Sequence, residues 1–415
     1  MRMGSDRIER VGVVGAGSTG LAIAWFLQRA GVQVEVLDRS GVAAGSSWGN
    51  AGWLTPALAG PLPEPGILRY GARAVLDRRS PLHVSLRPSR DLWSFLARFA
   101  RSSTRARWAD AMGHLASINA VALDAFDELA DAGVKVGASD VDILAVGRTT
   151  DDLHHLAAEV AAAAEAGLDA KADVLTGAAA RELEPQLTDE VGAGLLLRSQ
   201  RTLDPGDFCE QLAHDIVRRG GTIRPGVDVV AVHDDGRGVE VRDRLGPPRR
   251  FDAVVVATGA WLSRLVRPYG VRVPVQAGRG YSFTMPDRPA VGRPVYLPAQ
   301  RVVCTPLANG TRVAGTMELR APDAPFREDR IQQIAAAVAP YLAGELGSRS
   351  DEWCGSRPCS ADGLPLVGAT RSSRVFVHGG HGMWGITQGP ATARLLAEQI
   401  LGRPSEILRP LSPTR

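Results

Sequence analysis

The chain has 415 residues, with 48 lysines and arginines against 45 aspartates and glutamates and a formal net charge of +3. This length favours two domains, and the balanced charge speaks against a nucleic-acid partner. The four cysteines form no C-x-x-C pair and have no histidine at metal-ligand spacing, so we expect no metal site. No apolar run reaches about 18 residues, and the charged N-terminus leaves no room for a signal peptide. The sequence therefore predicts a cytoplasmic protein, with peripheral membrane contact left open.

Residues 10–40 read as a strand, a phosphate-binding turn, a helix and a second strand. A short β-branched run is typical of a buried parallel strand, and the motif G-x-G-x-x-G follows it. In this motif Gly15 permits the tight turn, Gly17 lets a pyrophosphate approach the backbone, and Gly20 lets the helix pack on the strand. The amides at the start of the helix, from Ser18 onward, are expected to face the diphosphate.

The segment after this helix carries the acidic residue that the motif requires. The helix is predicted to end at Gly31, and the strand 32–37 then ends in Asp38, next to Arg39. A carboxylate here accepts hydrogen bonds from both ribose hydroxyls and repels a 2′-phosphate. Because strand, glycines, helix and carboxylate have the required spacing, we predict a dinucleotide-binding domain and not an isolated glycine-rich turn.

Residues 39–60 are rich in Gly, Ser and Asn and keep no helical or strand period, so they are predicted to form a loop. In a dinucleotide fold, a loop after the second strand is placed to wrap the cofactor. By composition alone, an ordinary flexible loop is an equal alternative. The residues expected to contact the cofactor are Ser46, Ser47, Asn50, Ala51 and Gly52.

Residues 61–140 change character. Prolines interrupt the start, and helical spacing then follows over 91–101 and 112–133. These helices are predicted to lie outside the nucleotide-binding core. The basic segment 98–108 fits a solvated helix face, which is the commoner explanation, or contact with an acidic membrane surface.

The middle of the chain alternates strands and helices. We expect a strand at 142–147, helices at 150–166 and 207–219, and two strands around a polar turn within 222–243. A buried parallel strand at 253–258 then returns to the nucleotide-binding fold.

Two further segments are expected to reach the cofactor. Thr258 and Gly259 end a strand where a carboxyl-end turn approaches a bound nucleotide. After an antiparallel sheet at 271–316 and a helix at 331–342, a last strand at 375–378 enters a second glycine-rich turn that opens a helix. The turn residues expected at the cofactor are Gly382, Met383, Trp384 and Gly385.

The two glycine-rich turns indicate which dinucleotide is bound. A nicotinamide dehydrogenase needs one such turn, whereas a flavin also uses a second helix start. Reduced flavin carries negative charge near N1 and the C2 carbonyl, and the positive end of a helix stabilises that charge. The sequence therefore predicts FAD, bound non-covalently, and ranks NAD behind it.

Several segments, in chain order, resemble the D-amino acid dehydrogenase family, a branch of the glycine oxidase and D-amino acid oxidase superfamily. They are VVGAGSTGLAIAWFL, VEVLDRS, GSSWGNAGWLTP, PEPG with RSPL, ATGAWLSRL, GRGYS, VAGTMEL, GSRPCSADGLPLVG and HGGHGMWGITQGPA. The similarity spans nearly the whole chain. ATGAW and G-x-R-P-x-x-x-D-G-x-P-x-x-G are fairly specific to the superfamily.

This resemblance implies an α/β fold with a discontinuous, Rossmann-like FAD-binding domain. That domain is predicted to comprise residues 1–60, 170–265 and 350–415. A second, α+β substrate domain, built on an antiparallel sheet over the flavin, would comprise 61–169 and 266–349.

The resemblance also suggests catalytic residues. Arg357 matches the arginine that clamps the substrate carboxylate in glycine oxidase, and its alternative is a structural arginine in the turn. The assisting tyrosine of that enzyme falls near Val303, so Tyr281 is the candidate replacement, with a buried sheet tyrosine nearly as plausible. Met383 falls where that enzyme has an arginine, which suggests a larger, more apolar substrate pocket. His381 is a candidate base, although a histidine between glycines more often orients the turn.

The implied reaction is oxidation of an amino acid to an imino acid by hydride transfer from the α-carbon to flavin N5, followed by hydrolysis. The expected substrate is a D-amino acid or a cyclic imino acid, and the expected acceptor is a quinone or another carrier. The alternatives are a glycine- or sarcosine-type oxidase that uses oxygen, and a non-catalytic flavoprotein subunit of an electron-transfer complex. Cys359 lies near the position of a flavin-linking cysteine in some sarcosine oxidases, but the offset argues against covalent attachment.

Overall fold

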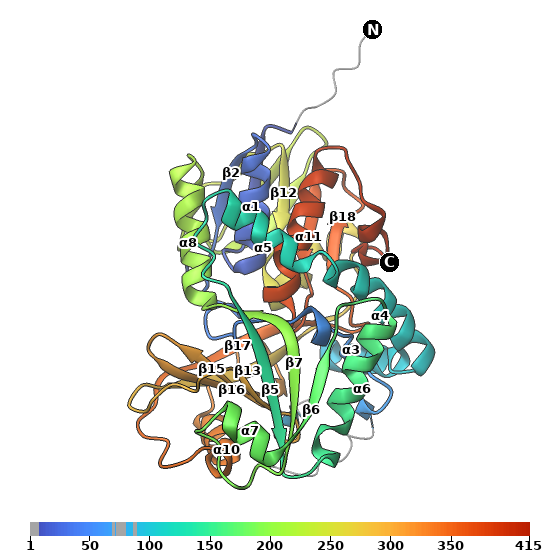
Figure 1. The fold of residues 1–415 in the computed structure, drawn as a ribbon. Helices are drawn as coiled ribbons and strands as arrows, with labels where there is room; N and C mark the ends of the chain where they lie inside the picture. The colour runs from blue at the N-terminus through green and yellow to red at the C-terminus, as the bar shows by residue number, and fades with distance from the viewer. Residues whose placement is uncertain (1–7, 69–70, 72–79, 86–88) are drawn as a thin grey trace.

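The computed structural model describes residues 8–68, 71, 80–85 and 89–415. Within these residues the chain forms a six-stranded sheet, a ten-stranded sheet and a three-stranded sheet. In Figure 1 the six-stranded sheet and its helices make up one half of the molecule and the ten-stranded sheet makes up the other.

The six-stranded sheet contains the predicted nucleotide-binding fold. In spatial order its strands are β18 (Leu366–Ala369), β19 (Val375–Gly379), β12 (Ala253–Val256), β1 (Arg10–Val14), β2 (Gln33–Leu37) and β8 (Thr222–Arg224). Neighbouring strands run parallel except for β18 and β19. The strand predicted at 253–258 therefore does return to the first sheet, where it pairs with β1.

Both faces of β1 are covered, which explains its β-branched sequence. Val11 and Val13 pack in one core cluster with α1 (Ser18–Arg29), α8 (Pro205–Arg218) and α11 (Gly385–Ile400). Val14 belongs to a second cluster, on the face covered by the three-stranded sheet. That sheet consists of β11 (Arg249–Phe251), β10 (Val239–Asp243) and β9 (Val229–Asp234). The two strands expected within 222–243 are thus present as β9 and β10.

The ten-stranded sheet is mostly antiparallel, as expected for residues 271–316. Its main path is β17 (Ser350–Ser360), β13 (Val275–Met285), β16 (Gly310–Leu319), β15 (Val302–Leu307), β14 (Val295–Leu297), β5 (Ser139–Gly147), β7 (Ala193–Thr202) and β3 (Trp53–Leu54). Two short strands pair at its side, β4 (Leu82–Val84) with β16 and β6 (Ala172–Thr176) with β7. The strand β17 crosses from this sheet toward the nucleotide fold.

The remaining helices are α3 (Arg90–Ser102), α4 (Arg105–Asn119), α5 (Ala122–Asp131), α6 (Asp151–Glu165), α7 (Gly177–Leu183), α9 (Leu262–Val266) and α10 (Glu328–Val338). The helices α7 and α9 were not predicted from the sequence, and the bounds of the others are shifted. The single helical stretch expected over 112–133 is broken between α4 and α5 at Ala120 and Val121. The helix expected over 207–219 begins at Pro205, because the side chain of Asp204 accepts hydrogen bonds from the first amides.

The expected division into two domains stays a prediction, although the sheets bear on its boundaries. Strands β6 and β7, within residues 172–202, pair in the ten-stranded sheet. Phe126 of α5 packs in the core cluster of the nucleotide fold, together with α1 and α11. None of the helices in the described part of the chain combines the length and the apolar run needed to cross a bilayer.

Asp215 anchors α8 to α1. Its carboxylate is 5% exposed, accepts a hydrogen bond of 2.7 Å from Trp25 Nε1 and pairs with Arg218 and Arg219. Burial raises the pKa of Asp215, but the hydrogen bonds from Trp25, Arg219 and Arg218 outweigh it and hold the pKa below its usual value. The charged form therefore stabilises the fold.

We predict that Asp215→Ala lowers the free energy of unfolding by about 2 kcal/mol at pH 7, measured by urea denaturation. A carboxyl with a depressed folded pKa contributes above its unfolded pKa and loses that contribution as the pH falls through the folded pKa. The deficit should therefore shrink below about pH 4. Asp151→Ala, at an aspartate with a 92% exposed side chain, is the control and should change stability by less than about 0.5 kcal/mol. A deficit independent of pH would contradict this role.

Candidate active site

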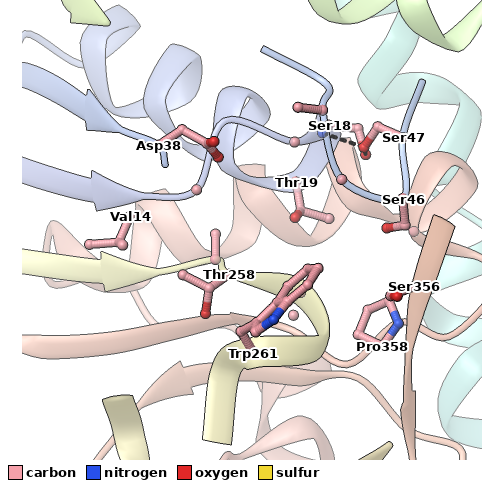
Figure 2. Close-up of a pocket in the computed structure, with 18 of the residues that line it drawn as sticks. Val14, Ser18, Thr19, Asp38, Ser46, Ser47, Thr258, Trp261, Ser356 and Pro358 are labelled. Carbon is pink, nitrogen blue, oxygen red and sulfur yellow. Dashed lines mark hydrogen bonds between the residues drawn. The ribbon is translucent and has the colours of Figure 1, made fainter. Parts of the chain in front are cut away.

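A cavity lies at the carboxyl ends of β1, β2 and β12, where the chain also starts α1 and α11 (Figure 2). Gly17 and Gly385, at the starts of the two helices, line this same cavity. The structure thus brings the two glycine-rich turns to one place. The expected residues that line the cavity are Gly15, Gly17, Ser18, Asp38, Arg39, Ser46, Ser47, Asn50, Thr258, Gly259, Arg357, His381, Gly382, Met383 and Gly385.

Steric contacts explain two of the three glycines in the first turn. Gly15 has φ +114°, and a Cβ there would lie 2.4 Å from the carbonyl oxygen of Ala257. A Cβ on Gly20 would lie 1.9 Å from the carbonyl oxygen of Gly15, so only glycine lets α1 start this close to β1. A Cβ on Gly17 would meet only Ser47 Oγ, at 3.2 Å, so the protein itself leaves room there. The role of Gly17 in letting a pyrophosphate approach the backbone therefore stays a prediction.

Asp38 shapes the turn as well as lining the cavity. One carboxylate oxygen accepts from the Ala16 amide at 2.8 Å, and the other accepts from the amides of Ser40 and Gly41 at 2.8 and 2.9 Å. These bonds join the end of β2 to the glycine-rich turn. The carboxylate retains about one acceptor site for a ribose hydroxyl, because an ionised carboxylate offers about four and three are used by these amides.

Trp261 forms a wall of the cavity that the sequence analysis did not assign. Its ring faces the cavity in Figure 2, and the Arg39 guanidinium stacks 4.0 Å from its centroid. Asp323 holds both residues, since it pairs with Arg39 and accepts a 2.9 Å hydrogen bond from Trp261 Nε1. This tryptophan is the last residue of the motif ATGAW. Its position shortly after the end of β12 could have indicated from the sequence that it lies at the cofactor cavity.

The loop after β2 contacts the start of α1. Ser47 Oγ accepts a 3.0 Å hydrogen bond from the Ser18 amide, and Asn50 lines both this cavity and a second one. Ala51 lines only the second cavity. Gly52 is not among the described residues that line either cavity. With φ +76° and a would-be Cβ 2.0 Å from the Leu203 carbonyl oxygen, Gly52 allows the close packing of β3 and β7.

The second cavity adjoins the first, and Asn50, Arg357, Met383 and Ile386 line both. Most of its lining is apolar and comes from α3, α4, β3 and the ten-stranded sheet. It includes Trp53, Leu62, Phe95, Phe99, Trp108, Met112, Tyr296, Val303, Met317 and Trp384. Trp384 is fixed by a 2.9 Å hydrogen bond from its Nε1 to the Gly60 carbonyl oxygen. This apolar character agrees with the expectation drawn from Met383.

Arg357 stands where the two cavities meet. Its guanidinium lies against Gly280, where an added Cβ would be 2.1 Å from Nη2, and Nη1 donates to the Thr316 carbonyl oxygen at 3.0 Å. No acidic side chain pairs with it within the described residues. Burial lowers the pKa of Arg357. A partly buried cation without a counter-ion is unfavourable, and an anionic ligand would stabilise it.

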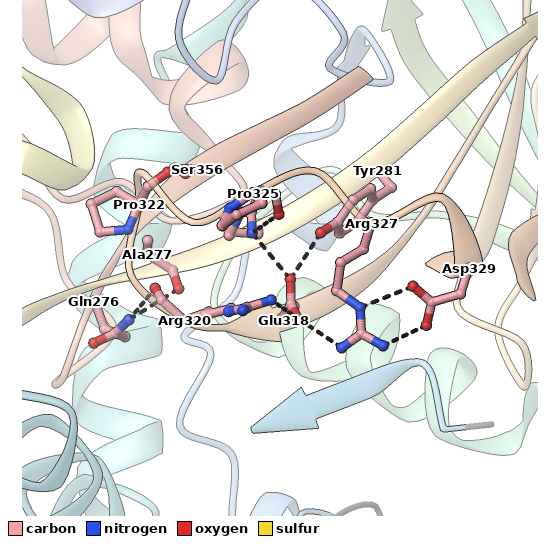
Figure 3. Close-up of polar contacts among 11 residues, drawn as sticks. Gln276, Ala277, Tyr281, Glu318, Arg320, Pro322, Pro325, Arg327, Asp329 and Ser356 are labelled. Carbon is pink, nitrogen blue, oxygen red and sulfur yellow. Dashed lines mark hydrogen bonds and ion pairs between the residues drawn. The ribbon is translucent and has the colours of Figure 1, made fainter. Parts of the chain in front are cut away.

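The structure does not bring Tyr281 to either cavity. Its hydroxyl donates a 2.8 Å hydrogen bond to Glu318, which also pairs with Arg279, Arg320 and Arg327 (Figure 3). Burial raises the pKa of Tyr281, so the hydroxyl stays protonated and donates. The proposed carboxylate-binding role for Tyr281 was therefore wrong, and the alternative of a buried sheet tyrosine fits.

A different tyrosine, Tyr296, lines the second cavity. Tyr296 of β14 pairs in register with Val303 of β15, the position where the assisting tyrosine was expected, and both line the second cavity. Its ring packs edge-on against Trp53 at 5.9 Å. Sequence reasoning missed it because the residue lies one strand over from the aligned position.

His381 lines the first cavity and is 3% exposed. Burial lowers its pKa well below the usual value, so the ring is neutral and a weak base. This geometry favours the role of orienting the turn over that of a catalytic base. Cys359 is buried and lines neither cavity among the described residues, and burial raises its pKa to about 11. A protonated, enclosed thiol is not set up to bond to a flavin.

Three side chains at the outer part of the second cavity lie close enough together to share an ion. Glu64, His155 and Glu159 place one ligand atom each within 4.8 Å of one another, and Arg301 lies 3.8 Å from Glu64. His155 Nε2 is 2.9 Å from Glu64, and this bond raises the pKa of His155. His155 and Arg301 are the cations that pair with these carboxylates, so we interpret the group as an ion-pair cluster. Sequence reasoning had examined metal-ligand spacing only around the cysteines.

Comparison with known proteins shows the family to which this chain belongs. The family model described as "FAD dependent oxidoreductase" (DAO) matches residues 10–399. A D-amino acid dehydrogenase of Methylobacterium nodulans is 32% identical over 408 residues, and one of Xanthobacter autotrophicus is 32% identical over 413 residues. Each alignment covers 96% of this chain and 96% of the relative. The chain belongs to the D-amino acid dehydrogenase family of FAD-dependent oxidoreductases.

Solved structures agree with the fold. Glycine oxidase from Bacillus cereus has a TM-score of 0.73 at 18% identity and covers 99% of both chains. Glycine oxidase from Geobacillus kaustophilus has a TM-score of 0.73 at 20% identity, covering 98% of this chain and 99% of that one. The expected α/β fold with a Rossmann-like FAD-binding unit is thereby confirmed. The family match and the relatives support the expected reaction, FAD-dependent oxidative deamination of an amino acid.

The residues of the first cavity fit FAD. Among the described residues, only Ser47 Oγ lies within 4 Å of the position of a Cβ on Gly17, and Thr258 Oγ1 is buried at the cavity wall without a hydrogen-bond partner. The start of α1 offers amides for a diphosphate, and the start of α11 offers its positive end for the flavin. The contacts of each individual residue with FAD remain predictions.

We predict that Gly17→Ala and Gly385→Ala each weaken FAD binding by at least tenfold while the protein still folds. An added Cβ meets only Ser47 Oγ at 3.2 Å in the first variant and makes ordinary contacts of 3.6 Å or more in the second, so the lost affinity comes from crowding of the ligand. Titration of apoprotein with FAD, followed by fluorescence, measures the dissociation constant. Gly113→Ala, in open space on α4, is the control. Unchanged affinity in both variants would place FAD elsewhere.

Proposed function

We propose that this protein is an amino acid dehydrogenase that oxidises D-amino acids, or cyclic imino acids, and passes the electrons to a quinone or another carrier. The single observation that carries the substrate class is Arg357, a partly buried cation without an acidic partner within the described residues, at the junction of the two cavities. The D-configuration rests on the relatives named D-amino acid dehydrogenase.

Arg357 is proposed to hold the substrate carboxylate. A planar guanidinium binds a carboxylate bidentately, and Nη2 can take part because the hydrogen bond to Thr316 uses Nη1. Gly280 leaves room for the guanidinium, because a side chain at this position would occupy the same space. This grip fixes the α-carbon at the edge of the first cavity, and such positioning lowers the barrier to transfer.

FAD supplies the hydride acceptor at N5. The remaining work falls to the protein, which binds the carboxylate, encloses the α-carbon and excludes water. Met383, Trp384 and Ile386 line the second cavity on its cofactor side, and Tyr296 and Val303 line it on the sheet side. We propose that this apolar space takes a large apolar side chain of the substrate.

We predict that D-amino acids with large apolar side chains bleach the flavin absorbance under anaerobic conditions and that Arg357→Met abolishes this while retaining FAD. The expected loss of substrate affinity is at least 100-fold, or about 3 kcal/mol, because a buried charge pair is lost. Arg279→Met removes a buried arginine that pairs with Glu318 away from the cavities and should leave KM within about twofold. The panel includes L-amino acids, N-alkyl amino acids and a cyclic imino acid.

Two results would contradict the proposal. Loss of FAD from Arg357→Met would make Arg357 a folding or cofactor residue. Bleaching by none of the substrates would favour the non-catalytic flavoprotein subunit.

The acceptor is proposed from the dehydrogenase names of the relatives. The mouth of the second cavity carries exposed apolar residues, Trp93 at 60% and Leu68 at 45% exposure, so a lipophilic acceptor or a membrane surface has a place to make contact. The expected cytoplasmic location and peripheral membrane contact stay predictions.

Stopped-flow reoxidation separates a dehydrogenase from an oxidase. We predict that the substrate-reduced protein is reoxidised by a soluble quinone at least 100-fold faster than by air-saturated buffer. Equal or faster reoxidation by oxygen would make the protein an oxidase.

A further inference from the structure

Two histidines and a threonine form a buried chain beside the first cavity. His378 is the penultimate residue of β19, His381 lies in the turn that follows, and Thr392 lies within α11; they are 0%, 3% and 0% exposed. His378 Nδ1 is 3.0 Å from the Thr19 carbonyl oxygen, and its Nε2 is 2.9 Å from Thr392 Oγ1. His381 Nε2 is 3.0 Å from the same hydroxyl oxygen.

The positions of the protons in this chain follow from what each atom can do. The carbonyl oxygen of Thr19 can only accept, so His378 carries a proton on Nδ1. Burial lowers the pKa of His378 to about 4, so the ring is neutral and its Nε2 is an acceptor. Thr392 must therefore give its single hydroxyl proton to His378.

The other contacts of the hydroxyl do not change this assignment. The carbonyl oxygens of Gln388 and Gly389 lie 2.8 and 3.1 Å from Thr392 Oγ1 and compete for the same proton. If either received it, the lone pair on His378 Nε2 would face the lone pairs of the hydroxyl oxygen. With the proton on the His378 side, the hydroxyl oxygen is free to accept from His381 Nε2–H.

The consequence appears at the other nitrogen of His381. With the proton held on Nε2, Nδ1 presents a lone pair, and this atom is buried without a partner within the described residues. A buried acceptor without a hydrogen-bond partner destabilises the folded protein. His381 lines the FAD cavity together with Gly382 and Gly385, so a donor on a bound ligand can relieve that cost.

We propose that His381 Nδ1 accepts a hydrogen bond from a neutral donor of bound FAD, a ribityl hydroxyl or the ring N3–H, and that Thr392 is the positioning residue that fixes the required tautomer. We assign the bond to the flavin and ribityl end of FAD because the turn that contains His381 also places Met383 at the junction with the second cavity. Asp38 and Gly17 mark the opposite end of the first cavity. His381 then serves cofactor binding, and it takes no proton from the substrate.

The first test measures the protonation of the two histidines in the protein of unchanged sequence, and variants serve only to assign the signals. Protein labelled with ¹⁵N-histidine is compared by NMR as apoprotein and after FAD addition, with His378→Leu and His381→Leu used to assign the signals. The proposal expects His378 protonated on Nδ1, His381 protonated on Nε2, and a shift of the unprotonated His381 Nδ1 toward hydrogen-bonded values when FAD binds. A proton on His381 Nδ1, or no shift on FAD binding, would overturn it.

The second test measures FAD affinity by titration of the apoprotein. His381→Leu and Thr392→Val are each expected to weaken FAD binding about five- to tenfold, as loss of one buried hydrogen bond would. Thr387→Val is the matched control, because it removes a buried hydroxyl from the same helix that bonds only Trp53 and Thr55. Affinity within twofold of the parent in both variants would refute the proposal, and equal weakening in the control would assign the effect to helix packing.

Discussion

The structure depends on the side-by-side packing of two helices whose starts meet at one edge of a parallel sheet. β1 leads into α1 and β19 leads into α11, and because both strands run in the same direction, both helices begin at their carboxyl ends. Glycines allow the close approach, since a Cβ on Gly389 would lie 3.2 Å from Thr19 Cγ2 and one on Gly385 4.0 Å from it. Two positive helix ends therefore face a single cavity.

This arrangement gives each end of the cofactor a different partner. The start of α1, with Gly17 and the Asp38 carboxylate, is shaped for the diphosphate and ribose. We infer that the turn before α11 faces the flavin; the same turn carries Met383 and Trp384 into the second cavity. Arg357 lies on β17, which pairs with β13 in the ten-stranded sheet. We infer that this strand sets where the substrate lies relative to the cofactor.

Local patterns were enough to predict the nucleotide-binding part of the site. Gly20 and Asp38 act through neighbours within their own βαβ unit, whereas Gly15 lies against Ala257 after the distant strand β12; the spacing of all three is visible in the sequence. The bounds of α1 and the return of β12 followed from the same periodicity. The meeting of the two glycine-rich turns was inferred from chemistry, because the charge distribution of a flavin calls for a second helix start.

Side chains positioned by distant strand pairing were not predictable in this way. Residues 276–285 of β13 are buried on both faces, and the pairing with β16 shifts between Arg279 and Tyr281, so period alone could not say which way Tyr281 points. Tyr296 reaches the substrate cavity because β14 pairs with β15 in one register, a fact that no local pattern encodes. The most direct test of the account is a crystal structure of the protein with FAD and the unreactive carboxylate benzoate. We predict density for the diphosphate at the Gly17 amides, for the flavin ring at Gly385, and for the carboxylate on Arg357; a flavin ring away from the start of α11, or a carboxylate bound elsewhere, would contradict it.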